Sequence, residues 1–243
     1  MDTEQAIREF WDEDAATYDD AEEHHAGSVA ERAAWAAALD RYLPPGGSVL
    51  DVGAGTGFLA LAAARLGYRV TALDLSEGML GRLRAAAAEQ GLDIDMHHGP
   101  AEQPPPGPFD AVMQRYLLWT LPDPGKALAA WREAAPNGKL VLFDGLYFSA
   151  DQADLVRSRL RRSVRKLRGA SAAHHRDYDD ELMAQLPLTK GMTPDVIVEL
   201  VESSGWGPAR LERLRDIEWT RTLARPPVER MFGVTPNFVI TAG

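Results

Sequence analysis

The chain has 243 residues, no cysteine and a formal net charge of −10 at pH 7. This length allows one sizeable α/β domain, the lack of cysteine excludes disulfide bridges and thiolate metal sites, and the acidic balance argues against an extended nucleic-acid interface. Because no secretory leader pattern or long apolar run is present, we expect one domain, residues 1–243, that is cytoplasmic and does not enter a membrane.

Strand and helix signals alternate along the first 145 residues. An acidic N-terminal arm with a helical stretch, residues 1–42, is expected to form a helical cap and ends before the break Pro44 to Gly47. Apolar and β-branched runs then predict strands at residues 48–52, 68–74, 94–97, 111–113 and 140–143. Helical periodicity between them predicts helices at 58–66, 76–90 and 124–135. Such alternation with short connections is typical of a parallel sheet covered on both faces.

The pattern changes after the strand at 140–143. Residues 146–190 are polar and rich in arginine, and we expect them to form a helical lid inserted after the fifth strand. Thr193 and Pro194 then provide a cap and a first-turn proline for a helix that runs to Ser204. The apolar run at residues 237–242 predicts a closing strand.

Three glycines follow the first predicted strand at alternate positions, Gly53, Gly55 and Gly57. Where a parallel strand turns into a helix, glycines allow a tight turn and let backbone amides approach a ligand directly. Asp74 ends the second strand, beside this loop in a right-handed crossover, where its carboxylate can accept two hydrogen bonds from a ribose. The pattern therefore predicts a ligand that contains a nucleoside.

Two nucleoside ligands compete for this loop, a dinucleotide and S-adenosylmethionine. Dinucleotide loops favour G-x-G-x-x-G, whereas this loop reads G-x-G-x-G and places Phe58 where the last glycine would stand. Asp51, inside the strand before the glycines, would repel a pyrophosphate and suits the ammonium of an amino-acid ligand. These residues favour S-adenosylmethionine.

At these residues the chain resembles the class I S-adenosylmethionine-dependent methyltransferases that act on small molecules. The resemblance rests on four stretches, "VLDVGAGTG" (49–57), "ALDLSEGML" (72–80), "FDAVMQRYLLWTL" (109–121) and "PNGKLVLFDG" (136–145). It implies a Rossmann-like, doubly wound α/β fold with a seven-stranded sheet, mostly parallel with an antiparallel last strand. It also implies that S-adenosylmethionine is the cofactor, S-adenosylhomocysteine is the product and no metal takes part.

The resemblance assigns parts of the cofactor to parts of the chain. Leu75 and Met79 would contact the adenine, the backbone of Gln114 would meet the amino-acid end, and Tyr18 in "FWDEDAATYDD" (10–20) would close over the cofactor. Together with the loop argument, this gives a set of predicted cofactor residues: Tyr18, Asp51, Gly53, Ala54, Gly55, Gly57, Asp74, Leu75, Met79, Ala101, Glu102 and Gln114.

One position departs from the family pattern. The third strand commonly ends in a glycine, an acid that accepts the adenine amino group and an alanine, but here Pro100 stands at the acid's position. The Ala101 amide can still donate to the ring, and Glu102 or Gln103 is the candidate for the missing acid.

The transferred methyl group is already activated on a sulfonium, so orientation and exclusion of water supply much of the catalysis, and a base is needed mainly for a hydroxyl acceptor. The candidates for such a base are His174, His175 and Asp144, although the histidines fit a solvated helix end and Asp144 fits a turn cap. The candidate acceptor contacts near the carboxyl ends of strands four and five are Arg115, Tyr116, Trp119 and Tyr147. Trp119 fits a core aromatic equally well.

The run from Arg157 to Gly169 is strongly basic in an acidic chain. It is either a solvated helix face or part of a lid that attracts an anionic acceptor.

We expect a methyltransferase that acts on the oxygen or nitrogen of a small metabolite, with specialised metabolism implied by the resemblance alone. The alternatives are a tRNA or protein methyltransferase, and a protein that binds S-adenosylmethionine without catalysis.

Overall fold

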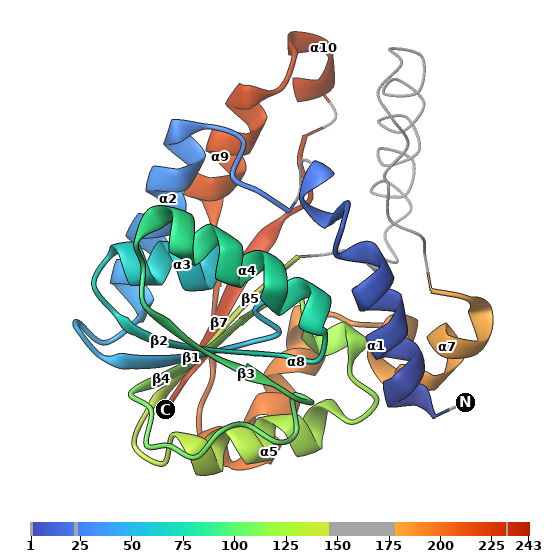
Figure 1. Ribbon diagram of the computed structural model, residues 1–243. Coiled ribbons are helices and arrows are strands. Elements are labelled where there is room, and N and C mark those ends of the chain that lie inside the picture. Colours follow the sequence, from blue (N-terminus) through green and yellow to red (C-terminus); the bar gives the residue numbers. More distant parts are fainter. Residues whose placement is uncertain (1, 22–23, 146–177, 232) are drawn as a thin grey trace.

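The computed structural model describes residues 2–21, 24–145, 178–231 and 233–243. One seven-stranded sheet has the order β3-β2-β1-β4-β5-β7-β6 (Figure 1). Strands β1 to β5 are parallel, and β7 runs antiparallel to both β5 and β6. The predicted fold class is therefore confirmed, including the antiparallel last strand. The strands are β1 Ser48–Val52, β2 Arg69–Asp74, β3 Ile94–His98, β4 Ala111–Arg115, β5 Lys139–Gly145, β6 Arg210–Arg213 and β7 Asn237–Ala242.

Helices cover both faces of this sheet (Figure 1). Helices α2, α3 and α4 pack on one face, and α5 and α8 pack on the other. The helical elements are α1 Thr3–Asp14, η1 Tyr18–Asp20, α2 Val29–Tyr42, α3 Phe58–Arg65, α4 Glu77–Gln90, η2 Leu118–Thr120, α5 Pro124–Ala134, α7 Asp180–Gln185, η3 Pro187–Lys190, α8 Pro194–Val201, η4 Glu202–Trp206, α9 Arg215–Ala224 and α10 Pro227–Arg230.

The capping residues predicted from the sequence begin the helices that flank the sheet. The Ser76 hydroxyl accepts a hydrogen bond from the Met79 amide at 3.1 Å, and the Thr193 hydroxyl accepts one from the Val196 amide at 3.3 Å. Each bond satisfies an amide that the first helical turn leaves without an intrahelical partner. The cap Ser76, two residues after Asp74, fixes the start of α4 at Glu77.

Strand β6 is an element that the sequence pattern did not predict. Its sequence "RLER" has no apolar alternation, and all four residues are exposed at the edge of the sheet. Period-two patterning arises from one buried face, so an edge strand with two solvated faces lacks the signal. Residues 146–177, most of the expected lid insert, lie outside the described residues.

Within the described ranges, no helix is both long and apolar enough to cross a membrane.

Candidate functional site

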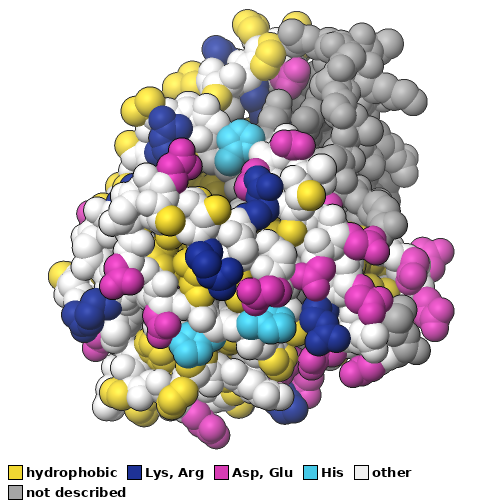
Figure 2. All heavy atoms as spheres, in the orientation of Figure 1, with side chains coloured by type: hydrophobic (Ala, Val, Ile, Leu, Met, Phe, Trp, Pro, Cys, Tyr) yellow, Lys and Arg dark blue, Asp and Glu magenta, His cyan; other side chains and the backbone are white. Residues whose placement is uncertain are grey.

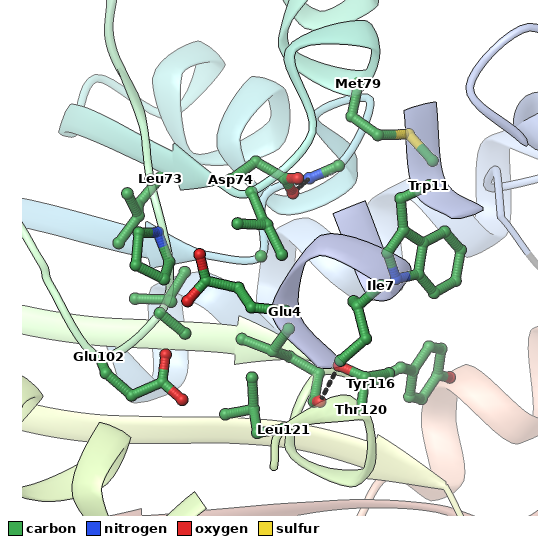
Figure 3. Close-up of a pocket in the computed structure, with 18 of the residues that line it drawn as sticks. Glu4, Ile7, Trp11, Leu73, Asp74, Met79, Glu102, Tyr116, Thr120 and Leu121 are labelled. Carbon is green, nitrogen blue, oxygen red and sulfur yellow. Dashed lines mark hydrogen bonds between the residues drawn. The ribbon is translucent and has the colours of Figure 1, made fainter. Parts of the chain in front are cut away.

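A cavity of about 880 Å³, counting its open mouth, lies at the carboxyl ends of β1, β2 and β4, and α1 forms one wall (Figure 3). Ligands of open α/β sheets bind at this edge, where the strand order reverses between β1 and β4. The lining residues come from α1, η1, α4, η2, the ends of four strands and the segments that follow them: Glu4, Ile7, Trp11, Tyr18, Val52, Gly53, Gly55, Leu73, Asp74, Leu75, Met79, Gly99, Pro100, Ala101, Glu102, Arg115, Tyr116, Leu117, Thr120, Leu121 and Pro122.

The three glycines of the loop have left-handed backbone conformations, with φ of 66° at Gly53, 56° at Gly55 and 98° at Gly57. A Cβ on Gly53 would lie 2.7 Å from Leu117, and one on Gly57 would lie 2.3 Å from Leu83. A Cβ on Gly55 would meet no atom within 4 Å. Gly53 and Gly57 thus allow close packing, whereas Gly55 keeps open the space that a ligand would fill.

Asp74 joins the second strand to this loop. One of its carboxylate oxygens accepts a hydrogen bond from the Gly55 amide at 2.7 Å, and the other accepts one from the Ser76 amide at 2.9 Å. Each oxygen retains a lone pair, so the carboxylate can accept two further bonds from a diol. Burial raises the pKa of Asp74 to about 6, while the Ser76 and Gly55 amides counteract this shift.

Asp51 lies on β1, two residues before Gly53, and is not one of the residues that line the cavity. Its side chain is buried, and its Oδ2 has no hydrogen-bond partner among the described residues. Burial raises its pKa to about 8, and the nearby Asp74 carboxylate also raises it. An unsatisfied carboxyl beside the glycine loop suits a cationic group of a ligand, because a cation favours its ionised form.

The loop after β3 contributes Gly99, Pro100, Ala101 and Glu102 to the cavity lining. The Trp131 indole donates a hydrogen bond to the Ala101 carbonyl at 2.7 Å, which fixes the loop at that residue. Glu102 is half-buried and points toward the cavity, with Glu4 of α1 nearby (Figure 3). Burial raises the pKa of Glu102, and the Glu4 carboxylate adds to that rise. This part of the cavity therefore holds two carboxyl groups and an apolar ring, Pro100.

Besides Asp51, five of the predicted site residues that the structure describes lie outside the cavity lining: Ala54, Gly57, Gln114, Trp119 and Asp144. Gln114 and Asp144 share a face of the sheet with Leu140 and Leu142, which pack in the core beneath α5 and α8. The Gln114 carboxamide accepts a hydrogen bond from the Leu117 amide at 2.7 Å and so fixes the turn after β4.

The predicted catalytic group Asp144 is 1% exposed and accepts a hydrogen bond from the Gly145 amide at 2.8 Å. Burial raises its pKa to about 7. Its side chain is buried on the sheet face of Leu140 and Leu142, and it is not one of the residues that line the cavity. Trp119 packs against Tyr178 with ring centroids 5.6 Å apart, which matches its alternative interpretation as a core aromatic.

Arg115 and Tyr116 line the cavity at the end of β4. The Arg115 guanidinium lies 3.6 Å from the ring centroid of Phe58 and 4.4 Å from that of Tyr116. Tyr116 adopts a left-handed φ of 60°, and its hydroxyl donates to Asn237 of β7. An uncommon backbone conformation of this kind at a cavity points to a functional residue.

The structure adds Glu4, Ile7 and Trp11 of α1 to the predicted site. The sequence of the arm indicated an aromatic cap, but contacts between a terminal helix and distant strand ends depend on docking that no local pattern encodes. The predicted residues Tyr147, His174 and His175 lie outside the described residues.

Residues 50–142 match a family model described as a methyltransferase domain. The chain is also similar to two proteins named ubiquinone biosynthesis O-methyltransferase. The one from Aromatoleum aromaticum is 39% identical over 101 residues, covering 40% of this chain and 43% of that one. The one from Caulobacter vibrioides is 43% identical over 84 residues, a third of each chain. The matches thus span less than half the length of these curated relatives.

Solved structures of low sequence identity share the fold. Haemonchus contortus phosphoethanolamine N-methyltransferase 2, in complex with phosphomonomethylethanolamine and S-adenosylhomocysteine, superposes with a TM-score of 0.62 at 16% identity, covering 97% of this chain and 60% of that one. An S-adenosylmethionine-dependent methyltransferase from Mesorhizobium loti gives a TM-score of 0.55 at 22% identity, covering 86% and 97%.

Proposed function

We propose that this chain, which carries a methyltransferase domain over residues 50–142 within a class I methyltransferase fold, transfers a methyl group from S-adenosylmethionine to the oxygen or nitrogen of a small molecule. The observation that carries the proposal is the hydrogen bond from the Gly55 amide to Asp74, which brings the glycine loop and the acid to one cavity. The loop would support the methionyl part, and Asp74 would hold the ribose.

The cofactor supplies a methyl group already activated on a sulfonium, so the chain's own residues are needed to bind, orient and exclude water. Tyr18 and Trp11 cover the cavity as an aromatic pair with ring centroids 6.0 Å apart. Burial raises the pKa of Tyr18 to about 12, so it stays neutral. Arg115 and Tyr116 would orient the acceptor at the end of β4.

Oxygen is the favoured acceptor atom, because the curated relatives are named O-methyltransferases. The test is transfer of a labelled methyl group from S-adenosylmethionine to a metabolite extract, followed by identification of the product. A labelled small molecule supports the proposal. Label found in RNA or protein, or cofactor binding without any transfer, would overturn it.

Cofactor binding is expected to release protons at pH 7. The Asp51 carboxyl, with a pKa of about 8, is largely protonated at pH 7 in the free protein, whereas Asp74, with a pKa of about 6, is largely ionised. A cationic group of the cofactor near Asp51 would displace its proton. We expect release of about half to one proton per cofactor and an affinity that rises from about pH 6 to 8.

Calorimetry in phosphate and in Tris, which differ in ionisation enthalpy, measures this release. The Asp51→Asn variant serves as the control and should release few protons. A heat of cofactor binding that is the same in phosphate and in Tris would refute the proposed proton release.

The same raised pKa values mean that folding takes up protons, so the free energy of unfolding of the free protein should fall as pH rises from about 4 to 8.

Glu102 is expected to recognise the amino group of adenine in place of the acid that Pro100 replaces. A carboxylate accepts a hydrogen bond from an amine but not from the keto oxygen of an inosine ring. Wild type should therefore bind S-adenosylhomocysteine roughly tenfold more tightly than S-inosylhomocysteine, and Glu102→Gln should lose most of that difference. Glu89→Gln on α4, which is exposed, is the control. Equal discrimination by wild type and Glu102→Gln would exclude this role.

A further inference from the structure

The N-terminal strap, defined as residues 3–20, forms one wall of the cavity, where Figure 3 shows Glu4, Ile7 and Trp11 among the lining side chains. It comprises α1, a short connection and η1, and it places Glu4, Ile7, Trp11 and Tyr18 in the cavity lining. Because these side chains form part of the cavity wall, movement of the strap would widen the cavity for a ligand as large as S-adenosylmethionine. The contacts that hold the strap therefore control access to the cavity.

Asp19 fastens the strap to the glycine loop and to α4. Its Oδ1 accepts a hydrogen bond from the Thr56 hydroxyl at 2.6 Å, and its Oδ2 accepts bonds from Arg82 Nη2 at 3.1 Å and Nε at 3.3 Å. Arg82 also donates to the Ala16 carbonyl at 3.3 Å. Thr56 lies between Gly55 and Gly57, so this contact reaches the loop that would support the cofactor.

Asp12 fastens the strap at a second point, the start of α4. Its Oδ1 accepts hydrogen bonds from the Ser76 hydroxyl at 2.6 Å and the Gly78 amide at 3.0 Å. A Cβ on Gly78 would lie 3.1 Å from that of Ala15, so the strap and α4 are in close contact here. Asp19 therefore binds the glycine loop and α4, and Asp12 binds the start of α4, close to Asp74.

We propose that Asp19 and Asp12 are positioning residues that latch the strap over the cofactor, and that cofactor exchange requires Asp19 to release Thr56 and Arg82. The inference rests on the proposed function, because it takes S-adenosylmethionine as the occupant. Hydrogen bonds to charged groups stabilise a structure more than bonds between neutral groups do. The Thr56 hydroxyl donates such a bond to the Asp19 carboxylate, and the bond is partly buried. Neither residue lines the cavity, so each acts through the strap.

A latch has a kinetic signature that a direct ligand contact lacks. It stabilises the closed strap with and without ligand, so weakening it speeds both entry and release. Stopped-flow binding of S-adenosylhomocysteine, followed by tryptophan fluorescence, measures both rates. We expect Asp19→Asn and Thr56→Val to raise the association and dissociation rate constants together, by about tenfold for Asp19→Asn, with Kd changed by less than about threefold.

Arg84→Gln is the matched control, because Arg84 pairs with Glu77 within α4 and does not touch the strap. It should leave both rate constants unchanged. The Arg82 to Asp19 ion pair is partly exposed, so added salt should speed release from wild type and have less effect on Arg82→Gln. A variant with a lowered unfolding temperature is set aside in favour of Thr56→Val, which removes a single hydrogen bond.

Unchanged rate constants in both Asp19→Asn and Thr56→Val would overturn the latch, and so would a rise in the dissociation rate constant alone. An equilibrium titration of wild type separates the two proposals. If S-adenosylhomocysteine does not bind, the proposed function fails and removes the premise of the latch. If it binds and the rates do not respond, the latch alone fails.

Discussion

Replacing Asp74 by alanine is expected to weaken binding of S-adenosylmethionine by about 2 to 3 kcal/mol, or roughly 30- to 150-fold. The variant loses the two charge-assisted hydrogen bonds expected from the ribose. It also frees the Gly55 and Ser76 amides, which Asp74 holds in place. Titration calorimetry measures the loss, and Asp74→Asn, which keeps one acceptor oxygen, should show an intermediate effect.

Asp95→Asn is the matched control for this experiment. Asp95 lies on the neighbouring strand β3, where its exposed carboxylate pairs with His97. We expect its affinity to equal that of wild type. Thermal unfolding of each variant separates a lost contact from a damaged fold. Wild-type affinity in a folded Asp74→Ala protein would show that the ribose is not held there.

Alanine substitution is expected to weaken cofactor binding most at Gly55 and to lower stability most at Gly57. At Gly55 the new methyl group would project into open space in the cavity, so we expect at least about 100-fold weaker cofactor binding and an unfolding temperature lowered by roughly 5 °C from left-handed backbone strain. At Gly57 the methyl group would lie 2.3 Å from Leu83. Strain and overpacking there should lower the unfolding temperature by roughly 10 °C or more.

Differential scanning calorimetry and cofactor titration on the same two proteins test this contrast. Each variant serves as the control for the other, because both add one methyl group to the same loop. If Gly55→Ala binds the cofactor like wild type, the cavity beside Gly55 does not hold it. If Gly57→Ala is as stable as wild type, the packing explanation for that glycine is wrong.

The sheet and the glycine loop could be predicted because their signals are local. Gly53 to Gly57 and Asp74 lie within one strand, turn, helix and strand unit, whose chain connection forces them together. Asp144 is a candidate base by its position at the end of a strand, but side chains alternate between the two faces of a strand, and this alternation also indicates which face Asp144 occupies. Asp144 follows Leu140 and Leu142 at two-residue steps, so the pattern places it on the same face of the sheet as these buried leucines.

The walls of the cavity could not be predicted from local patterns. Glu4 and Glu102 are about 100 positions apart in the sequence and meet because α1 docks across the strand ends. The hydrogen bonds of Asp12 and Asp19 to α4 and the glycine loop depend on the same docking. Acidic residues in a polar arm give no sign of their partners, because the same composition is typical of a solvated surface.

The most direct test of the account is a crystal structure of the protein with S-adenosylhomocysteine. We expect the ribose hydroxyls within about 2.5–2.8 Å of the Asp74 carboxylate, with the ligand lying between Gly55 and Tyr18. A cavity left vacant at saturating ligand, or a ribose bound away from Asp74, would contradict it.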